Sequence, residues 1–570
     1  MIRLETDILI LGSGGAGLFA ALHAKAGAPE ASVTVAVKGL LGKSGCTRMV
    51  QGGYNVAVGP GDSVERHFLD TIEGGGWIND QDLAWKLVET APARVRELEN
   101  QIGCFFDRGP DGGLHRKAFA GQSFDRTVHK GDLTGIEIIG RLAEQVWARD
   151  IRRLEDHRAI ALLPDAAGAA LAGVLFIDMR SGDFTLVRAR AVLLATGGGP
   201  TMYRYHTPSG DKSCDGMAMA LRAGLPLRDM EMVQFHPTGL LAGPGTRMTG
   251  TVLEEGLRGA GGWLLTGGGE RFMLRVDDRA ERATRDIISR TMIEEIRAGR
   301  ATPHGGLYLK MAHLGPARVR AEFKGMVERC ADCGLDLAGG LVEVIPSAHY
   351  MMGGVVFAPD GSTALPGLFA AGEDTGGVHG ANRLGGNGVA DSTIFGGIAG
   401  DTMAAWLRDA SGFREPDRDL LDQAAGRALA PLHRNGAGRL ADLRDRLATL
   451  MWDKVGILRT GRDLADAEAA LADLGAELAE TGAGSASPAY NPAWHDWLNL
   501  ENLILVSRAI LLAAQTRQGS RGAHYRCDFP EPGDLAASSY TEVRLQGEVL
   551  TAANRPVRHT RVRPAQETGR

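Results

Sequence analysis

Three side chains in this sequence are suited to holding an anionic ligand, and they come from separated parts of the chain. His236 stands in a Gln-Phe-His-Pro run, His349 stands far along the chain, and Arg383 follows in a glycine-rich stretch. Arginine offers a planar fork that binds a carboxylate through two hydrogen bonds, and histidine offers a directed donor. A lone histidine is more often a satisfied structural residue. Two histidines at the edges of one interrupting segment, with an arginine after it, predict instead a ligand clamp between two domains.

A glycine turn near the start of the chain predicts where a cofactor binds. Residues 8–11 read as a buried strand and residues 16–25 as an alanine-rich helix, with Gly-Ser-Gly-Gly-Ala-Gly between them. In such a turn, Gly12 permits the bend, Gly14 lets the backbone approach a pyrophosphate, and Gly17 lets the helix pack on the strand. The helix N-terminus adds unpaired N–H groups and a positive dipole end. We therefore predict a dinucleotide site, with an ordinary glycine-rich β–α turn as the alternative.

Later residues favour FAD over NAD as the dinucleotide. The second strand, 33–37, ends at Lys38, where NAD-binding folds commonly carry an acidic residue that binds the ribose. Residues 39–44 look like a phosphate loop, but two rather than four residues separate the glycines, so we reject that interpretation. Another buried strand, 188–196, ends in Thr-Gly-Gly-Gly, the usual second backbone contact of FAD proteins, and a further strand ends at Glu373.

The elements that must position these residues follow an α/β pattern. Strand, turn and helix signals alternate through 1–233, stop at 234–347, and return in 348–410. We therefore predict a Rossmann-like FAD-binding domain in two parts, 1–233 and 348–410, interrupted by an inserted α+β capping domain, 234–347. A helical domain, 411–531, and a small C-terminal domain, 532–570, complete the predicted organisation.

Composition limits the remaining possibilities. The chain has 570 residues, too many for one hydrophobic core, and its 44% apolar and 23% charged residues are typical of a globular protein. A net charge of −6 does not indicate the basic surface that nucleic-acid-binding proteins carry. We find no run of about 18 apolar residues and no signal peptide, so we expect no direct membrane span and a cytoplasmic location. The six cysteines do not form a disulfide framework, and the C-x-x-C of Cys330 and Cys333 lacks a second pair, so we expect no metal site.

Several short motifs occur in an order that is far more specific than any one of them. Besides the glycine turn, these are Gln-Gly-Gly at 51–53, Ala-Thr-Gly-Gly at 195–198, Gln-Phe-His-Pro-Thr-Gly at 234–239, Arg-Asp at 285–286, His-Tyr at 349–350, His-Gly-Ala-Asn-Arg-Leu at 379–384 and Ser-Arg-Gly-Ala-His-Tyr-Arg at 520–526. Over nearly the whole chain, this order resembles the flavoprotein subunit of succinate dehydrogenase and fumarate reductase. The same superfamily includes L-aspartate oxidase and adenylylsulfate reductase α. The resemblance implies an FAD-dependent oxidoreductase that moves a hydride between flavin and a carbon next to a carboxylate.

The resemblance also implies roles for individual residues. Arg285 matches the arginine that carries the proton to or from the substrate carbon, and Glu255 and Arg258 match the relay that feeds it. The residues expected to bind the substrate are His236, His349, Arg383, Glu254 and Phe119. The residues expected to hold FAD are Gly12, Ser13, Gly14, Gly15, Ala16, Gly17, Lys38, Ser44, Thr47, Gln51, Gly52, Gly53, Ala195, Thr196, Gly197, Gly198, Asp215, Glu373, Arg383, Gly388 and Val389.

Some residues depart from the family pattern. Cys46 stands where membrane-bound members carry the histidine that bonds covalently to the flavin, so we expect non-covalent FAD, with a cysteinyl link as the less favoured alternative. Glu254 stands where the family has a threonine that donates to a substrate carboxylate. Two facing carboxylates repel unless one is protonated or the substrate carries a cation, so a substituted or amino acid stays open beside a plain dicarboxylate. Glu254 could also turn away and pair with an arginine. Ala260, Gly388 and Gly519 replace a glutamate, a serine and a glutamate of the family.

These observations leave one leading hypothesis and two alternatives. The leading hypothesis is an enzyme of the succinate dehydrogenase and fumarate reductase type that exchanges electrons with a separate iron–sulfur or ferredoxin-like subunit, because the chain has no cluster motif of its own. Its location would be cytoplasmic, or peripheral at the inner membrane through that partner. The first alternative is an amino acid oxidase of the L-aspartate oxidase kind, in which Glu254 could meet an ammonium. The second is a flavin electron-transfer subunit without substrate chemistry, and the presence of Arg285 and the clamp argues against it.

Overall fold

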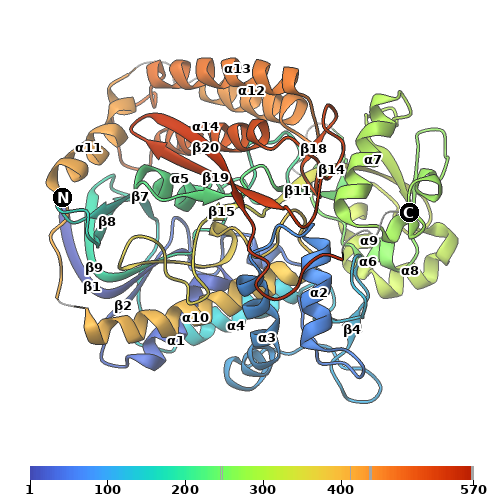
Figure 1. Cartoon of the computed structure of the whole chain (residues 1–570), viewed down its shortest axis with the longest axis horizontal. Helices are drawn as coiled ribbons and strands as arrows, with labels where there is room; N and C mark the ends of the chain where they lie inside the picture. Colours follow the sequence, from blue (N-terminus) through green and yellow to red (C-terminus); the bar gives the residue numbers. More distant parts are fainter. Residues whose placement is uncertain (244–245, 247, 411, 435–438, 566–570) are drawn as a thin grey trace.

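A seven-stranded sheet with β1 (Ile2–Leu11) near its centre organises the N-terminal part of the chain (Figure 1). β1 pairs in parallel with β2 (Val33–Ala36) on one side and with β9 (Phe184–Leu194) on the other. Residues 8–11 are buried, as expected for a strand covered on both faces. The predicted α/β class is therefore confirmed. The outer strands are β6 (Arg152–Leu154), β16 (Leu368–Ala370), β8 (Leu171–Asp178) and β7 (His157–Pro164), the last two being antiparallel.

The computed structural model describes residues 1–570 except 244–245, 247, 411, 435–438 and 566–570. The predicted start of the helical domain at 411 and the last residues of the predicted C-terminal domain, 566–570, lie outside the described residues.

Two helices pack against each other beneath the sheet. α1 (Gly15–Gly27) follows the glycine turn, and α10 (Asn387–Asp409) follows the glycine-rich stretch (Figure 1). A Cβ atom at Gly396 in α10 would collide with the backbone oxygen of Ala16 in α1. Glycine therefore permits a closer approach of the two helix backbones than any side chain would allow. This contact brings the returning part of the chain back to the glycine turn.

The inserted segment forms a separate body around an antiparallel sheet, drawn in green in Figure 1. α7 (Arg285–Arg297) packs on the first strand of this sheet, and the Ser289 hydroxyl donates to the Phe235 carbonyl oxygen at 3.0 Å. Buried apolar side chains give this body its own core, with Leu257 and Met292 among them. The strands, in order across the sheet, are β11 (Val233–Leu240), β14 (Leu341–Met351), β13 (Leu307–Lys310) and β12 (Trp263–Leu265). The short helices are α6 (Gly256–Gly259), α8 (Pro316–Glu322) and α9 (Lys324–Ala331).

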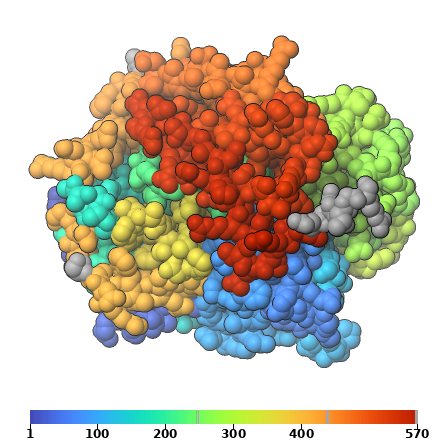
Figure 2. Space-filling model, in the orientation of Figure 1, coloured from blue at the N-terminus to red at the C-terminus, as the bar shows by residue number. Residues whose placement is uncertain are grey.

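Helices dominate the region after α10. α14 (Pro492–Thr516) is long and apolar enough to cross a membrane by length and composition, but 78% of its most apolar window is buried inside the protein. Its apolar surface is thus accounted for by packing, mainly against α13. The last strands, β19 (Ser539–Gln546) and β20 (Val549–Pro556), form a hairpin that joins the early strand β10 (Leu227–Arg228). Figure 2 shows these C-terminal residues in red across the middle of one face. The other helices here are α11 (Arg418–Leu429), α12 (Arg439–Lys454) and α13 (Gly461–Glu480).

One predicted helix ends differently from the sequence expectation. The pattern predicts a helix over 80–101, but α3 (Gln81–Glu97) ends earlier and continues as a π-helical turn over Leu98–Ile102. Gly103 ends this turn with a φ of +87°, which glycine adopts without strain. The remaining elements are α2 (Val64–Gly74), α4 (Thr134–Trp147), α5 (Asp215–Arg222), β3 (Tyr54–Asn55), β4 (Arg116–Lys117), β5 (Thr127–Val128), β15 (Gly354–Val355), β17 (Leu458–Arg459) and β18 (Tyr525–Arg526).

Candidate active site

A cavity of about 440 Å³ lies where the main sheet meets the inserted body. It runs from the glycine turn past the loop 44–53 to the residues that begin and end the inserted segment. Most of the predicted site residues therefore come together at one place. Those that line the cavity are Gly12, Ser13, Gly14, Gly15, Ala16, Lys38, Ser44, Thr47, Gln51, Gly52, Gly53, Phe119, Ala195, Thr196, Gly197, Asp215, His236, Glu254, Glu255, Arg285, His349, Glu373, Arg383, Gly388 and Val389. Three predicted residues are not in its wall, namely Gly17, Gly198 and Arg258.

The glycine turn has the backbone geometry that a pyrophosphate requires. Gly12 has a φ of +112°, and a Cβ atom there would collide with the carbonyl oxygen of Ala195. α1 begins after Gly14, and the Gly15 N–H donates to the Thr47 hydroxyl at 3.0 Å. Ala16, the next residue of the first turn, also lines the cavity, so this positive helix end lies at the cavity wall. A Cβ atom at Gly17 would collide with the Gly12 carbonyl oxygen. Gly17 therefore serves the packing of helix on strand, and the remainder of the turn fits the diphosphate of FAD.

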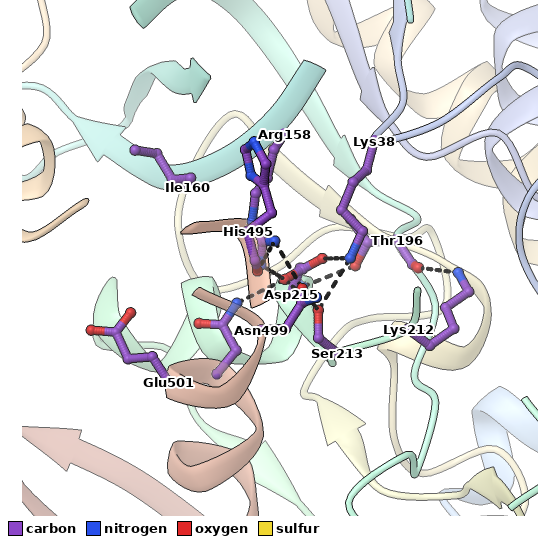
Figure 3. Close-up of polar contacts among 12 residues, drawn as sticks. Lys38, Arg158, Ile160, Thr196, Lys212, Ser213, Asp215, His495, Asn499 and Glu501 are labelled. Carbon is purple, nitrogen blue, oxygen red and sulfur yellow. Dashed lines mark hydrogen bonds and ion pairs between the residues drawn. The ribbon is translucent and has the colours of Figure 1, made fainter. Parts of the chain in front are cut away.

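Figure 3 shows a cluster of charges at the end of the cavity next to β2. The Lys38 ammonium donates to Asp215 Oδ2 at 2.8 Å, and Arg158 Nη2 donates to Asp215 Oδ1 at 3.0 Å. Burial alone would raise the pKa of the Asp215 carboxyl, but the charges of Lys38 and Arg158 hold it below its usual range. Asn499 of α14 accepts from Arg158 at 2.8 Å, so the helical region also supports this end. Lys38 and Arg158 together carry one positive charge more than Asp215 compensates, and this net charge favours a polar, anionic part of a dinucleotide.

The middle of the cavity wall carries Cys46 and Glu373. A Cβ atom at Gly198 would lie 2.9 Å from Glu373 Oε1, so Gly198 makes room for this glutamate instead of lining the cavity. Burial raises the pKa of Glu373 to about 7. Burial, together with the charge of Glu373, raises the pKa of the Cys46 thiol to about 12. The thiolate is the nucleophilic form of cysteine, so this environment disfavours bond formation at Cys46.

At the other end, one glutamine joins two buried arginines. Arg285, the first residue of α7, donates from Nη1 to Gln234 Oε1 at 2.9 Å, and Arg383 donates from Nη2 to the same oxygen at 3.1 Å. Arg285 also donates to Glu255 Oε2 from Nε at 2.9 Å and from Nη2 at 2.6 Å. Burial and the charge of Arg285 lower the pKa of Arg383 to about 10. Two guanidinium groups held this close favour a dianionic ligand between them.

The two predicted histidines face each other beside these arginines. Their ring centroids lie 5.2 Å apart, with His236 on β11 and His349 on β14. Burial and the charge of Arg285 hold the pKa of both imidazoles well below the usual value, so both rings are neutral. The Nδ1 atom of His236 accepts from the Thr238 N–H at 3.3 Å, which leaves the ring proton on Nε2. Nδ1 of His349 pairs with the Thr207 hydroxyl at 2.6 Å.

Arg258 lies behind Glu255, out of the cavity. Its Nη2 is 3.7 Å from Glu255 Oε1, and its Nη1 donates to the Glu281 carbonyl oxygen at 2.8 Å. Burial lowers the pKa of Arg258, and burial alone would raise that of Glu255, but Arg285 and Arg258 together hold the Glu255 pKa below its usual value. Arg285, Glu255 and Arg258 thus form a continuous line from the cavity into the inserted body. Alternating acid and base groups in such a line can pass a proton.

Glu254 lines the cavity and also pairs with a cation, which is lysine and not the arginine considered from the sequence. Its Oε2 lies 3.4 Å from Lys117 Nζ, and the residue is only 3% exposed. Burial raises the pKa of the Glu254 carboxyl, although Lys117 opposes that shift. Arg329 of α9 lines the same part of the cavity and donates to the Val252 carbonyl oxygen at 2.9 Å.

Sequence reasoning missed several members of this site. Gln234 is visible in the sequence only as part of a motif, and Lys117, Arg158, Thr207 and Arg329 carry no signal, because each reaches the site only through long-range packing. Within the part of the chain that the structure describes, no group of three metal-ligating side chains could hold a metal ion.

Comparisons with known proteins agree with this geometry. The family model described as an FAD binding domain matches residues 7–389, and that of the fumarate reductase flavoprotein C-terminus matches residues 444–568. The chain is 41% identical over 532 residues to a fumarate reductase (CoM/CoB) subunit of Methanothermobacter marburgensis, covering 92% of this chain and 95% of the relative. It is 36% identical over 560 residues to the 8-methylmenaquinol:fumarate reductase flavoprotein subunit of Wolinella succinogenes, covering 95% and 88%. A solved mutant of the Escherichia coli quinol fumarate reductase flavoprotein matches with a TM-score of 0.93 and 32% identity over 99% of both chains.

Proposed function

Because this chain belongs to the family of fumarate reductase and succinate dehydrogenase flavoprotein subunits, which are FAD-dependent oxidoreductases, we propose that it reduces the C=C bond of a dicarboxylate. Both relatives described above are named fumarate reductases, and Cys46 replaces the histidine whose covalent link favours succinate oxidation in the family. Fumarate is the first substrate to test.

The observation that carries this proposal is the convergence of two arginines and two neutral histidines on one cavity. Arg383 and the Nε2–H of His236 bind the carboxylates, and His349 contributes a further ring nitrogen. Bound FAD supplies the ring system that carries the hydride. The clamp residues would hold the substrate by its carboxylates, with an alkene carbon within reach of Arg285.

Proton transfer is assigned to Arg285. A guanidinium loses a proton only where its surroundings return one, and Arg285 Nη2 lies 2.6 Å from Glu255 Oε2. The proton leaves Nη2 for the substrate carbon, and the replacement proton passes from Arg258 to the ionised Glu255 carboxylate and from there to Nη2. Arg258, 3.7 Å behind Glu255, connects this relay to the inserted body. The product gains one hydride and one proton, which balances the reduction of the double bond.

We further propose that FAD is held without a covalent bond and that electrons arrive through a separate subunit. The half-buried thiol of Cys46, whose raised pKa keeps it protonated, supports the first statement. The relatives are named as subunits, and the names of two of them include a CoM/CoB pair and 8-methylmenaquinol. The sequence has no cluster motif of its own, so the partner would be an iron–sulfur or ferredoxin-like subunit, which could also hold the chain at a membrane surface.

One observation favours a second candidate function. Glu254 places a carboxyl group in the cavity wall, where Arg329 acts on it. An ionised Glu254 would repel a substrate carboxylate and attract an ammonium. An amino acid oxidase of the L-aspartate oxidase kind would use it in that way.

The test is anaerobic reoxidation of the chemically reduced holoenzyme. We expect fumarate to restore the oxidised flavin absorbance rapidly, and we expect aspartate not to bleach the flavin of the oxidised holoenzyme. Arg285→Ala should slow this reoxidation by roughly 10²- to 10⁴-fold, the usual contribution of a positioned proton donor, while FAD content stays unchanged. Arg297→Ala, at the exposed far end of α7, is the matched control and should behave as wild type. Unchanged reoxidation in Arg285→Ala would remove Arg285 from the mechanism.

A further inference from the structure

Glu254 is enclosed by charged groups from several elements. Lys117 of β4 lies 3.4 Å from its carboxylate on the side away from the cavity, and Asp132, in the turn before α4, acts on it from the same region. Arg329 of α9 approaches it along the cavity wall. Glu255 follows it in the chain and is committed to Arg285. The positive charge of Lys117 and the negative charge of Asp132 offset each other, so the cavity groups decide the balance at Glu254.

The charged groups in the cavity wall have a net positive charge that two negative charges balance and three would exceed. Arg285, Arg383 and Arg329 contribute three positive charges, and Glu255 contributes one negative charge. Arg258 behind Glu255 and the carboxylate of Glu373 in the cavity wall carry opposite charges, which offset each other above about pH 7. His236 and His349 are neutral, as argued above. A dicarboxylate therefore neutralises the site when Glu254 is uncharged. An ionised Glu254 would leave one uncompensated negative charge in a buried region, which is costly.

We propose that Glu254 is the specificity-determining group of this site and that a dicarboxylate binds together with one proton, which Glu254 takes up so that its O–H donates to a substrate carboxylate. This inference rests on the proposed function and deepens it. The proton comes from solvent, and the carboxylate of Glu254 becomes a carboxylic acid with no other bond changed. The protonated group then supplies the hydrogen bond that the family's threonine hydroxyl supplies at this position. Burial of Glu254 and its raised pKa both reduce the cost of this uptake.

The link between dicarboxylate binding and proton uptake predicts how strongly Kd depends on pH. Above the pKa of Glu254 in the free protein, each rise of one pH unit should weaken dicarboxylate binding about tenfold, because one proton must be taken up per ligand. Glu254→Gln keeps the shape of the side chain and donates a hydrogen bond from its N–H without titrating. Glu254→Thr changes the shape but supplies a hydroxyl donor that does not titrate either. Both variants should therefore bind a dicarboxylate with little dependence on pH.

Malonate, a dicarboxylate that cannot be reduced, is the probe for the FAD-loaded protein. Calorimetry in two buffers with different ionisation enthalpies gives the number of protons taken up, and titrations from about pH 7 to about pH 9 give the slope of Kd. We expect wild type to take up about one proton per malonate, and Glu254→Gln and Glu254→Thr to take up about none. Glu328→Gln, an exposed glutamate on α9, is the matched control and should keep the wild-type uptake.

The outcomes separate this inference from the proposed function. Malonate binding to wild type without proton uptake would overturn the inference while leaving the proposed function intact. Uptake that persists in Glu254→Gln would overturn it too, since the proton would then go to His236, His349 or another group. Tighter binding of aspartate than of malonate, lost in Glu254→Gln, would replace it with an ammonium site. A protein that neither binds malonate nor is reoxidised by fumarate would refute both. The uptake measured on wild type needs no variant, so a variant that fails to fold does not block the test.

Discussion

Replacing Gln234 with methionine should weaken dicarboxylate binding more than it slows the chemical step. Gln234 Oε1 accepts from both Arg285 and Arg383, and its Nε2 donates to the Arg383 carbonyl oxygen at 2.7 Å. Methionine has a similar length and neither polar group. Arg285 keeps its two hydrogen bonds to Glu255 in such a variant. The guanidinium of Arg383 loses the one side-chain hydrogen-bond partner that it has among the described residues, although it still lies over the Tyr350 ring.

The magnitude follows from this difference. A hydrogen bond to a charged group contributes about 1.5–3 kcal/mol, which corresponds to roughly a 10- to 100-fold change in an equilibrium constant. We therefore expect the KM for fumarate and the Kd for malonate to rise roughly 10- to 100-fold in Gln234→Met. The kcat should fall less than about tenfold, because the Arg285–Glu255 pair that moves the proton remains in place.

The assay is anaerobic steady-state turnover with a reduced dye as electron donor, with malonate binding measured by calorimetry on the same preparations. Gln546→Met, at an exposed position at the end of β19, is the matched control and should leave both constants unchanged. A kcat that falls as far as KM rises would refute the division of labour between Arg383 and Arg285. An unchanged KM would show that Gln234 does not position Arg383.

Two further predictions concern the cofactor region. Cys46→Ser should bind FAD as wild type does, and acid denaturation should release the flavin from both proteins, because the half-buried thiol has a raised pKa and is protonated. Flavin that stays on the denatured wild-type chain and leaves the variant would reveal a cysteinyl link. Glu373→Gln should stabilise the apoprotein against urea at about pH 8 and not at about pH 4.5. The pKa of Glu373 is raised to about 7 in the folded chain, so ionised Glu373 lowers the free energy of unfolding. This destabilisation grows as the pH rises from the pKa of the unfolded chain to about 7, and glutamine removes it. Equal stability of wild type and Glu373→Gln against urea at about pH 8 would contradict the raised pKa of Glu373.

Local patterns in the sequence are sufficient to predict the half of the site that would bind the cofactor. The strand, glycine turn and helix at 8–25 are contiguous, and their geometry follows from residue types alone. The same holds for Thr196, which follows a buried strand of the main sheet. Parallel strands end at one edge of a sheet, so such strand ends meet without further information. The family resemblance then supplied the roles of the substrate residues.

The positions that could not be predicted depend on packing between distant segments. Gln234 and Arg383 lie far apart in the chain, and no periodicity indicates that one amide holds two guanidinium groups. The family resemblance predicts that Arg258 feeds Arg285, but the sequence does not indicate that it lies one layer behind Glu255 and outside the cavity wall. The direction of the Glu254 side chain depends on Lys117, which comes from another strand. Burial and charge balance in the folded chain determine these side-chain positions, and neither can be read from the order of residues in the sequence.

The division of the clamp between two parts of the chain explains why its neutral residues matter. Arg285 stands on the inserted body and Arg383 on the returning part of the main domain, and the two guanidinium groups repel each other. Glu255 offsets the charge of Arg285 directly, whereas Arg383 depends on the dipole of Gln234 and on the ligand. A dianion that bridges the two arginines therefore also joins the two parts of the chain. In the proposed function, the charge of the dicarboxylate therefore holds the two parts of the chain together as well as providing recognition, and the proposed protonation of Glu254 keeps the total charge of the site balanced.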